Sequence, residues 1–215
     1  GLLINKLDNE NIDKIIEEFV EKFKDIEENE FLIFQKEIYK RIIKDNKFQD
    51  LFLEFFIKIR EIYSLTKNYD EKYFINLIET KFKFDYKNES SGFVSPIENE
   101  ESIDDIIVLN SEDNRINNID LILKFIEYNY FSDTILTEIS DALVNCDYIP
   151  DIYRFFNNSF VKEKYVYAKS QYEKLKNKIS QIQNKRDSVL LISILELFPF
   201  CNKKNLDDIS TMKSI

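Results

Sequence analysis

The sequence predicts an all-α fold. Apolar side chains recur at steps of three and four residues along most of the chain, which places them on one face of successive helices. Only 2 Gly and 3 Pro occur among 215 residues, so the residues that favour tight hairpin turns are scarce. The composition is 44% hydrophobic and includes 19 Phe and 12 Tyr. A chain of this length can bury roughly 70% of its unfolded surface, so we expect it to fold without a disulfide or a metal.

Four helices are predicted before residue 88. The first begins near Asn9 to Asn11, the second follows Asn29, and the fourth ends at about Phe84. The third is rich in aromatic residues. The apolar residues that define the four faces are Ile12, Ile15, Ile16, Phe19, Val20, Phe23 and Ile26; Phe31, Phe34, Ile38 and Ile42; Phe48, Leu51, Phe52, Phe55, Phe56, Ile59 and Ile62; and Tyr73, Phe74, Leu77, Ile78 and Phe82.

An acidic segment follows, from Asn88 to Asn114. It contains eight Asp and Glu residues and no Lys or Arg, a net charge of −8. This composition predicts a flexible, solvated loop, acting as a linker, as a cover for a basic helix, or as a docking tail for a basic partner. Its apolar residues between Ile103 and Leu109 also allow it to fold back onto the protein.

Helical spacing returns at Ile119 and continues nearly to the C-terminus. One helix is expected around residues 119–126, and another around 135–143 with Ser132 as its cap. Pro150 predicts the first turn of a third helix. A long unbroken helix is expected over residues 165–182, and a last one from about Lys185 to Phe198 before Pro199.

Short connections between these helices predict stacked antiparallel pairs. We expect an α-solenoid of about five HEAT-type pairs, in one domain over residues 1–200, although no sequence repeat is visible. The acidic loop at about 88–114 would interrupt this domain, and residues 201–215 would form a tail.

The composition excludes several classes of site. The chain has no His, so Ser-His-Asp and Cys-His catalytic sites and His-bound metals are impossible, and its two Gly cannot build a phosphate-binding loop. No carboxylate spacing singles out a general acid and base, so we expect no enzyme activity and no cofactor. Cys146 and Cys201 lack metal-ligand spacing. The absence of a signal-peptide pattern or membrane span predicts a cytoplasmic protein, and we expect a monomer.

Three blocks resemble one protein family. Residues 4–7 (Ile-Asn-Lys-Leu), followed by Ile12, are similar to the Leu-Asn-Lys-Leu-Thr start of the middle domain of eukaryotic translation initiation factor 4 gamma. Residues 117–132 are similar to its Gly-Asn-Ile-x-Phe-Ile-Gly-Glu-Leu-Phe helix. Residues 186–197 resemble its closing Arg-Ile-Arg-Phe-Met-Leu-x-Asp-Val-Leu-Asp-Leu helix. Abundant Ile, Asn and Lys indicate an A/T-rich genome, so the chain would be a divergent, protist-like or large-virus-like version.

This resemblance implies a non-catalytic scaffold that binds and stimulates a DEAD-box RNA helicase of the initiation-factor 4A type. It also implies contact with mRNA and other initiation factors. Ile4, Leu7, Ile12 and Arg186 fall at the family's helicase-contacting positions. Apolar residues at the first helix equally suit internal packing, so both interpretations remain open for Ile4, Leu7 and Ile12.

Residues 162–186 are the only basic region, with eight Lys and Arg, two Glu and a net charge of +6. Lys174, Lys178 and Lys185 share a stripe and are candidate RNA contacts. The stripe also fits a solvated helix face, and the chain's net charge of −10 disfavours strong RNA binding. A direct RNA-binding solenoid, or a related adaptor domain in mRNA decay, splicing or poly(A)-dependent control, is therefore the alternative function.

The chain departs from the family where Asn117 and Leu123 replace two glycines and Lys124 replaces an acidic residue. Ser188 and Phe198 replace two arginines, which weakens the expectation of RNA contact.

Overall fold

A computed structural model describes residues 6–66, 72–86, 109, 111–132 and 134–201. These residues form ten α-helices and one 3-10 helix, and none of them lies in a strand. The predicted all-α fold class is confirmed. The chain divides into two compact units, one of residues 1–85 and 94–122 and one of residues 86–93 and 123–215. The single domain predicted over residues 1–200 therefore spans parts of both units.

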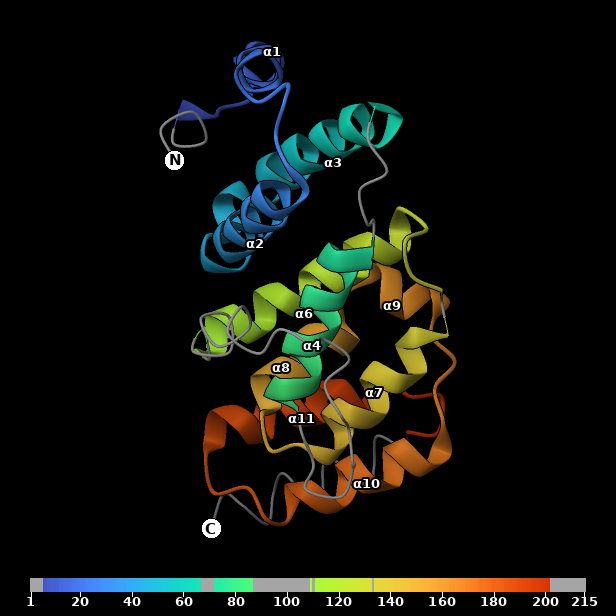
Figure 1. Cartoon of the computed structure of the whole chain (residues 1–215). Coiled ribbons are helices and arrows are strands. Elements are labelled where there is room, and N and C mark those ends of the chain that lie inside the picture. Colours follow the sequence, from blue (N-terminus) through green and yellow to red (C-terminus); the bar gives the residue numbers. More distant parts are fainter. Residues whose placement is uncertain (1–5, 67–71, 87–108, 110, 133, 202–215) are drawn as a thin grey trace. The chain divides into compact units, whose positions relative to one another are not determined.

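The first unit is built from the N-terminal helices. They are α1 (Ile12–Lys22), α2 (Glu28–Lys44), the 3-10 helix η2 (Asn46–Phe48), α3 (Gln49–Thr66), α4 (Lys72–Asp85) and α6 (Glu112–Glu127) as far as residue 122. Helix α2 packs against both α3 and α4, and α1 packs against α3. Figure 1 labels these helices.

Local sequence explains why these helices begin and pack where they do. The Glu27 side chain accepts from the backbone at Glu30 and the Glu30 side chain accepts from Glu27 N–H at 3.2 Å, so the two form a capping box at the start of α2. The apolar face of α1 is buried as its spacing predicts. The ring of Phe19 lies 4.8 Å from that of Phe34 and 5.8 Å from that of Phe55, which joins α1, α2 and α3 in one aromatic core.

Two buried asparagines fix α6 to its neighbours. Tyr39 Oη donates to Asn118 Oδ1 at 2.8 Å, and Asn118 Nδ2 donates to the Ile78 carbonyl at 3.3 Å. Asn117 Nδ2 donates to the Ile43 carbonyl at 2.8 Å. These bonds connect α6 with α2 and α4, and we call Asn117 and Asn118 the asparagine clamp. Because an unmade buried hydrogen bond is costly, the clamp specifies one register for α6.

A charged pair is also buried in this unit. Lys81 Nζ forms an ion pair with Asp85 Oδ1 one turn along α4, and both side chains have no exposed area. Burial lowers the pKa of Lys81, while Asp85 acts in the opposite direction and the nearby charge of Arg115 lowers the pKa further. The Asp85 carboxylate therefore offsets part of the burial effect that disfavours a cation at this position.

The second unit begins with the end of α6 and Tyr86. Its other helices are α7 (Ile135–Asn145), α8 (Ile149–Asn157), α9 (Ser159–Lys164), α10 (Lys169–Ile179) and α11 (Lys185–Leu195). Helix α8 packs against α7, α9 and α11, and α10 packs against α7 and α11 (Figure 1). Pro150 occupies the first turn of α8, as predicted. Tyr86 Oη donates to the fully buried Asp151 at 2.8 Å.

Helix α6 ends in a Schellman motif. Asn129 has a positive φ of 61°, its N–H donates to the Ile126 carbonyl at 2.9 Å, and the Tyr130 N–H donates to the Phe125 carbonyl at 2.8 Å. The rings of Phe125 and Tyr130 lie 5.1 Å apart, which supplies the apolar contact that accompanies this motif. Asparagine thus occupies a position that glycine usually fills.

The prediction of one long helix over residues 165–182 is wrong at both ends. Helix α9 ends at Lys164, α10 spans Lys169–Ile179, and residues 165–168 and 180–182 are not in an α-helix. Tyr165 Oη lies 2.9 Å from Ser140 Oγ and also hydrogen-bonds Gln171 Oε1, which holds the backbone out of the helical path. The Tyr-Val-Tyr triplet at 165–167 favours extended backbone, a signal that the apolar spacing concealed.

Three other boundaries differ from expectation. Phe48 lies in η2 before α3 and is exposed rather than directed inward. Helix α6 begins at Glu112, so the last residues of the segment predicted as loop over 88–114 are helical. Helix α11 ends at Leu195, short of Phe198. Most of that acidic segment, residues 88–108, and residues 202–215 of the predicted tail lie outside the described residues.

Candidate protein-binding surfaces

The N-terminal lead-in is held in a fixed conformation before α1. Asp8 Oδ1 accepts from the N–H groups of Glu10 and Asn11, each at 2.9 Å, while Asn11 Oδ1 accepts from the Asp8 N–H at 2.9 Å. Asn11 Nδ2 also donates to the Lys6 carbonyl at 2.7 Å. These reciprocal bonds fix the direction in which the chain enters α1. Ile4 lies outside the described residues.

Leu7 and Ile12 lie in the core of the first unit. Their exposed fractions are 8% and 7%, so little of either side chain is available to a partner. The Asp8–Asn11 bonds turn Leu7 inward, and Ile12 begins the buried face of α1. Of the two interpretations of these residues, their burial favours internal packing.

The exposed surface from Asp8 to Glu30, which includes α1, is acidic. Residues 8–30 contain ten Asp and Glu against three Lys, a net charge of −7, and all thirteen side chains are exposed. One of them, Asp13, accepts from Lys58 Nζ of α3 at 2.9 Å, and Glu54 accepts from the same amine at 3.1 Å. These hydrogen bonds raise the pKa of Lys58, and the bond to Asp13 contributes most. The remaining carboxylates give this face a field that attracts basic protein surfaces and repels RNA.

Two lysines of the predicted basic stripe in the second unit already bond to other residues of the chain. Lys178 Nζ forms an ion pair with Asp147 Oδ1 at 2.9 Å, and Lys174 Nζ donates to Asn145 Oδ1 at 3.1 Å. Asn145 is the last residue of α7 and Asp147 lies in the connection between α7 and α8, so the two lysines tie α10 to the end of α7 and to that connection. An RNA phosphate would have to compete with these acceptors. Lys185 is exposed at the first residue of α11, away from both contacts.

Arg186 lies in the first turn of α11 with an exposed side chain. Its backbone N–H donates to Asn184 Oδ1 at 2.9 Å, which makes Asn184 the N-cap of the helix. The structure therefore leaves Arg186 on the surface, where a partner can reach it. Arg186 belongs to the second unit and the residues around Leu7 to the first.

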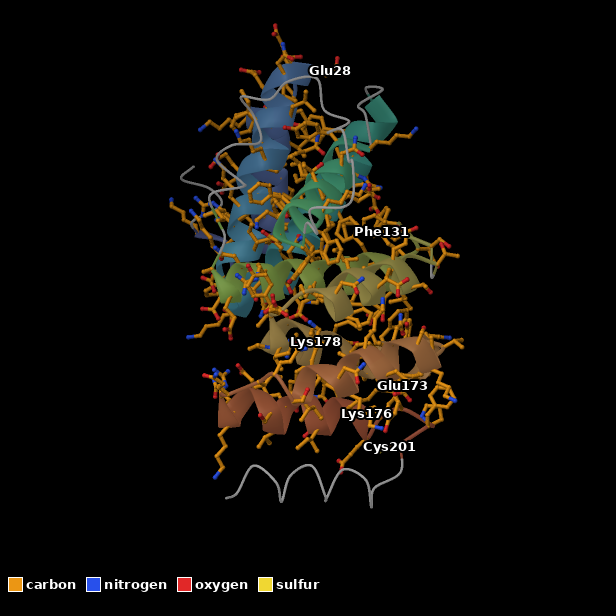
Figure 2. The ribbon with its side chains drawn as sticks, turned by 90° about the horizontal axis from the view of Figure 1, so that it is seen from below. Glu28, Phe131, Glu173, Lys176, Lys178 and Cys201 are labelled. Atoms are coloured by element: carbon orange, nitrogen blue, oxygen red, sulfur yellow. The ribbon has the colours of Figure 1, made fainter. Side chains whose placement is uncertain are left out.

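Three lysines that the sequence did not single out are more available than Lys174 and Lys178. Lys164 and Lys169 are exposed, Lys176 is half-buried, and none of the three has an ion pair or hydrogen bond in the described structure. Figure 2 shows Lys176 and Glu173 on α10, with Lys178 at a different edge of the helix. Two residues along a helix correspond to about 200° of rotation, so Lys176 and Lys178 face opposite ways.

The described residues contain no group of three or more Cys, Asp or Glu side chains arranged to hold a metal ion. Their helices also lack any span with the length and apolar character needed to cross a bilayer. Cys146 is buried, which raises the pKa of its thiol to about 11 and makes it a poor nucleophile.

Comparison with protein-family models, with curated proteins and with solved structures finds no match to this chain.

Proposed function

We propose that this chain is a non-catalytic helical scaffold that binds and stimulates a DEAD-box RNA helicase of the initiation-factor 4A type. Its helices would form a HEAT-type α-solenoid of about five antiparallel pairs. Packing between sequence neighbours α2 and α3, α7 and α8, and α10 and α11 supports this arrangement. The protein would act in the cytoplasm as a monomer, alongside mRNA and other initiation factors.

The observation that carries the proposal is the asparagine clamp. Asn118 is the asparagine that the chain shares with the family's Gly-Asn-Ile helix, and it is buried with bonds to Tyr39 and to the Ile78 carbonyl. A fold would retain a residue that lies where three of its helices meet, even while the surface of the protein diverges. The resemblance thus includes a side chain with a physical role in the architecture.

The surface argues for a protein partner before RNA. The exposed side chains of residues 8–30, which include those of α1, carry a net charge of −7, and Lys174 and Lys178 are occupied by Asn145 and Asp147. Because RNA affinity depends on phosphate neutralisation, both features weaken the direct RNA-binding alternative. A scaffold with contacts on both units would bias the open and closed states of a two-lobed helicase.

Because Leu7 and Ile12 are buried, we expect the helicase contact of the first unit at Ile4 and at the exposed face of α1. Substitution of Glu17 and Glu21 by Lys reverses two exposed charges on α1. We expect this double variant to weaken binding of purified 4A-type helicase by roughly tenfold, about 1.4 kcal/mol. Ile4→Asp should have a similar effect, and Arg186→Glu should test the contact of the second unit.

Lys14→Glu provides the matched control, because Lys14 is also exposed on α1 and the substitution also changes its charge by two. It makes the acidic face more acidic, so it should preserve or improve binding. Unchanged affinity in the Glu17, Glu21, Ile4 and Arg186 variants would move the contact elsewhere. Failure of the parent to bind the helicase, with capture of a decay, splicing or poly(A)-binding factor, would favour the related adaptor function.

A further inference from the structure

The segment between α9 and α10, residues 165–168, is rigid although it is not helical. Its backbone is extended at both ends, with φ and ψ of −79° and 134° at Tyr165 and −92° and 138° at Ala168. Tyr165 is anchored by Ser140 and Gln171, and the Gln171 side chain donates in turn to Asp141 Oδ1 at 2.8 Å. This buried network holds one end of the segment in place.

Aromatic contacts anchor the other tyrosine. The Tyr167 ring lies 4.9 Å from that of Phe198 and 6.1 Å from that of Phe156, with which it is stacked. Tyr165 also contacts the Phe156 ring at 5.8 Å. Both tyrosines therefore point into the second unit, and the residue between them is forced outward by the alternation of an extended chain.

That residue is Val166, which is 85% exposed, more than any other large apolar side chain in the described structure. The N–H groups of Val166 and Tyr167 make no hydrogen bond within the described structure, and neither do their carbonyls. The segment thus presents a fixed apolar side chain together with unused backbone donors and acceptors. An extended peptide backbone can pair with such groups in the manner of strand addition.

The charges beside Val166 are positive and available. Lys164 and Lys169 flank the segment, and Lys176 lies two turns after Lys169 on the same face of α10. Glu163 and Glu173 are exposed nearby and reduce the local charge. A modest positive excess suits one or two carboxylates, whereas an RNA backbone would need more phosphate contacts to overcome the chain's net charge of −10.

We propose that residues 164–169 form a docking strip for an extended acidic peptide with an apolar side chain. The peptide backbone pairs with the free N–H and carbonyl of Val166, because the groups of Tyr167 face the opposite edge of an extended segment. Its apolar residue covers Val166, and its carboxylates meet Lys164, Lys169 and Lys176. This inference is independent of the helicase contact proposed above. It holds for the second unit whether or not the chain binds a helicase.

The test measures binding of a fluorescent Asp-Glu-Val-Ile-Val-Glu-Asp peptide to the full chain by anisotropy. We expect specific, saturable binding that weakens with added salt. Val166→Asp should reduce affinity at least roughly tenfold, because it places a charge in the apolar contact and repels the peptide. Val189→Asp is the matched control, since Val189 is a second exposed valine, on α11, and should leave affinity unchanged.

Two further arms separate the parts of the proposal. A peptide N-methylated at alternate amides keeps its charge but cannot donate, so it should bind more weakly than the parent peptide. The Lys164→Glu and Lys169→Glu double variant should no longer bind the acidic peptide and should instead bind a Lys-Lys-Val-Ile-Val-Lys-Lys peptide. Amide NMR shifts should be largest at Val166.

Several outcomes would overturn the inference. They are no saturable binding by the parent, equal binding by the Val166→Asp and Val189→Asp variants, or equal binding of the N-methylated peptide. Tight, salt-sensitive binding of oligouridylate with no peptide binding would assign the lysines to nucleic acid instead.

Discussion

Tyr39 and Asn118 are 79 residues apart in the chain, yet their side chains share a 2.8 Å hydrogen bond in the core of the first unit. Tyr39 is fully buried and Asn118 nearly so. The bond joins α2 to α6, two helices of this unit that are far apart in the sequence. Removing one partner should therefore destabilise the unit as a whole.

We expect Tyr39→Phe to lower the free energy of unfolding by about 1–3 kcal/mol, because Asn118 Oδ1 would lose its donor in a buried site. Asn118→Leu should cost at least as much, since the Ile78 carbonyl also loses its donor. The urea midpoints of both single variants and the double variant form a thermodynamic cycle. Additive effects, with no coupling energy, would show that the bond has no part in stability.

The same tyrosine predicts a loss of stability at alkaline pH. Burial, with a smaller effect of the Asp85 charge, raises the pKa of Tyr39 well above its ordinary value near 10. Above pH about 10 the unfolded chain therefore loses the Tyr39 proton while the folded chain retains it, so stability falls as pH rises. Tyr39→Phe should flatten this fall between about pH 9 and about pH 11.

Tyr128→Phe serves as the control, because Tyr128 is exposed. It should leave the slope of unfolding free energy against pH as in the parent. An alkaline slope in Tyr39→Phe equal to that of the parent would attribute the effect to other tyrosines.

The Schellman motif at the end of α6 predicts that Asn129→Gly stabilises the protein by roughly 0.5–1 kcal/mol, since glycine adopts a positive φ without strain. Asn129→Ala should destabilise it by a similar amount. Thermal melts of the two variants against the parent are sufficient. If alanine were tolerated as well as glycine, the positive φ of 61° would not be required here.

The buried ion pair of α4 predicts that removing one partner lowers stability more than removing the other. Asp85→Asn should cost about 3–5 kcal/mol, because it leaves the Lys81 charge buried near the charge of Arg115. Lys81→Met leaves Asp85 without its partner instead, and it should cost less because the nearby charge of Arg115, which disfavours a cation at this site, favours an anion there. The comparison is made on urea unfolding curves near neutral pH. Equal losses in the two variants would mean that the charge of Arg115 does not distinguish a buried Lys81 from a buried Asp85.

The helical faces were predictable because apolar spacing reports directly on which side of a helix is buried. Phe19, Phe55, Leu143 and Leu175 are all in the core as their spacing predicted. Spacing cannot identify the polar residues that join the core. Asn117 and Lys81 look like solvated residues in the sequence, and their burial depends on partners on other helices or one turn away.

The break at residues 165–168 was missed for a related reason. Tyr165 and Tyr172 satisfy helical spacing, and both are buried. The apolar pattern alone therefore does not distinguish one continuous helix from an extended segment followed by a shorter helix. The decisive contacts are those of Tyr165 with Ser140 and Gln171. The hydrogen bond of Lys174 and the ion pair of Lys178 likewise depend on acceptors about 30 residues earlier, at the end of α7 and in the connection that follows it.

The central claim, that the chain is a helicase scaffold, is tested most directly by the ATPase rate of a purified 4A-type helicase with saturating RNA, measured as this protein is added. The account predicts that the rate rises severalfold and saturates. It also predicts that the protein alone has no ATPase activity, and that the Glu17→Lys and Glu21→Lys double variant needs a roughly tenfold higher concentration for the same effect. A helicase rate unchanged at every concentration of the folded protein, together with no detectable complex, would contradict the account.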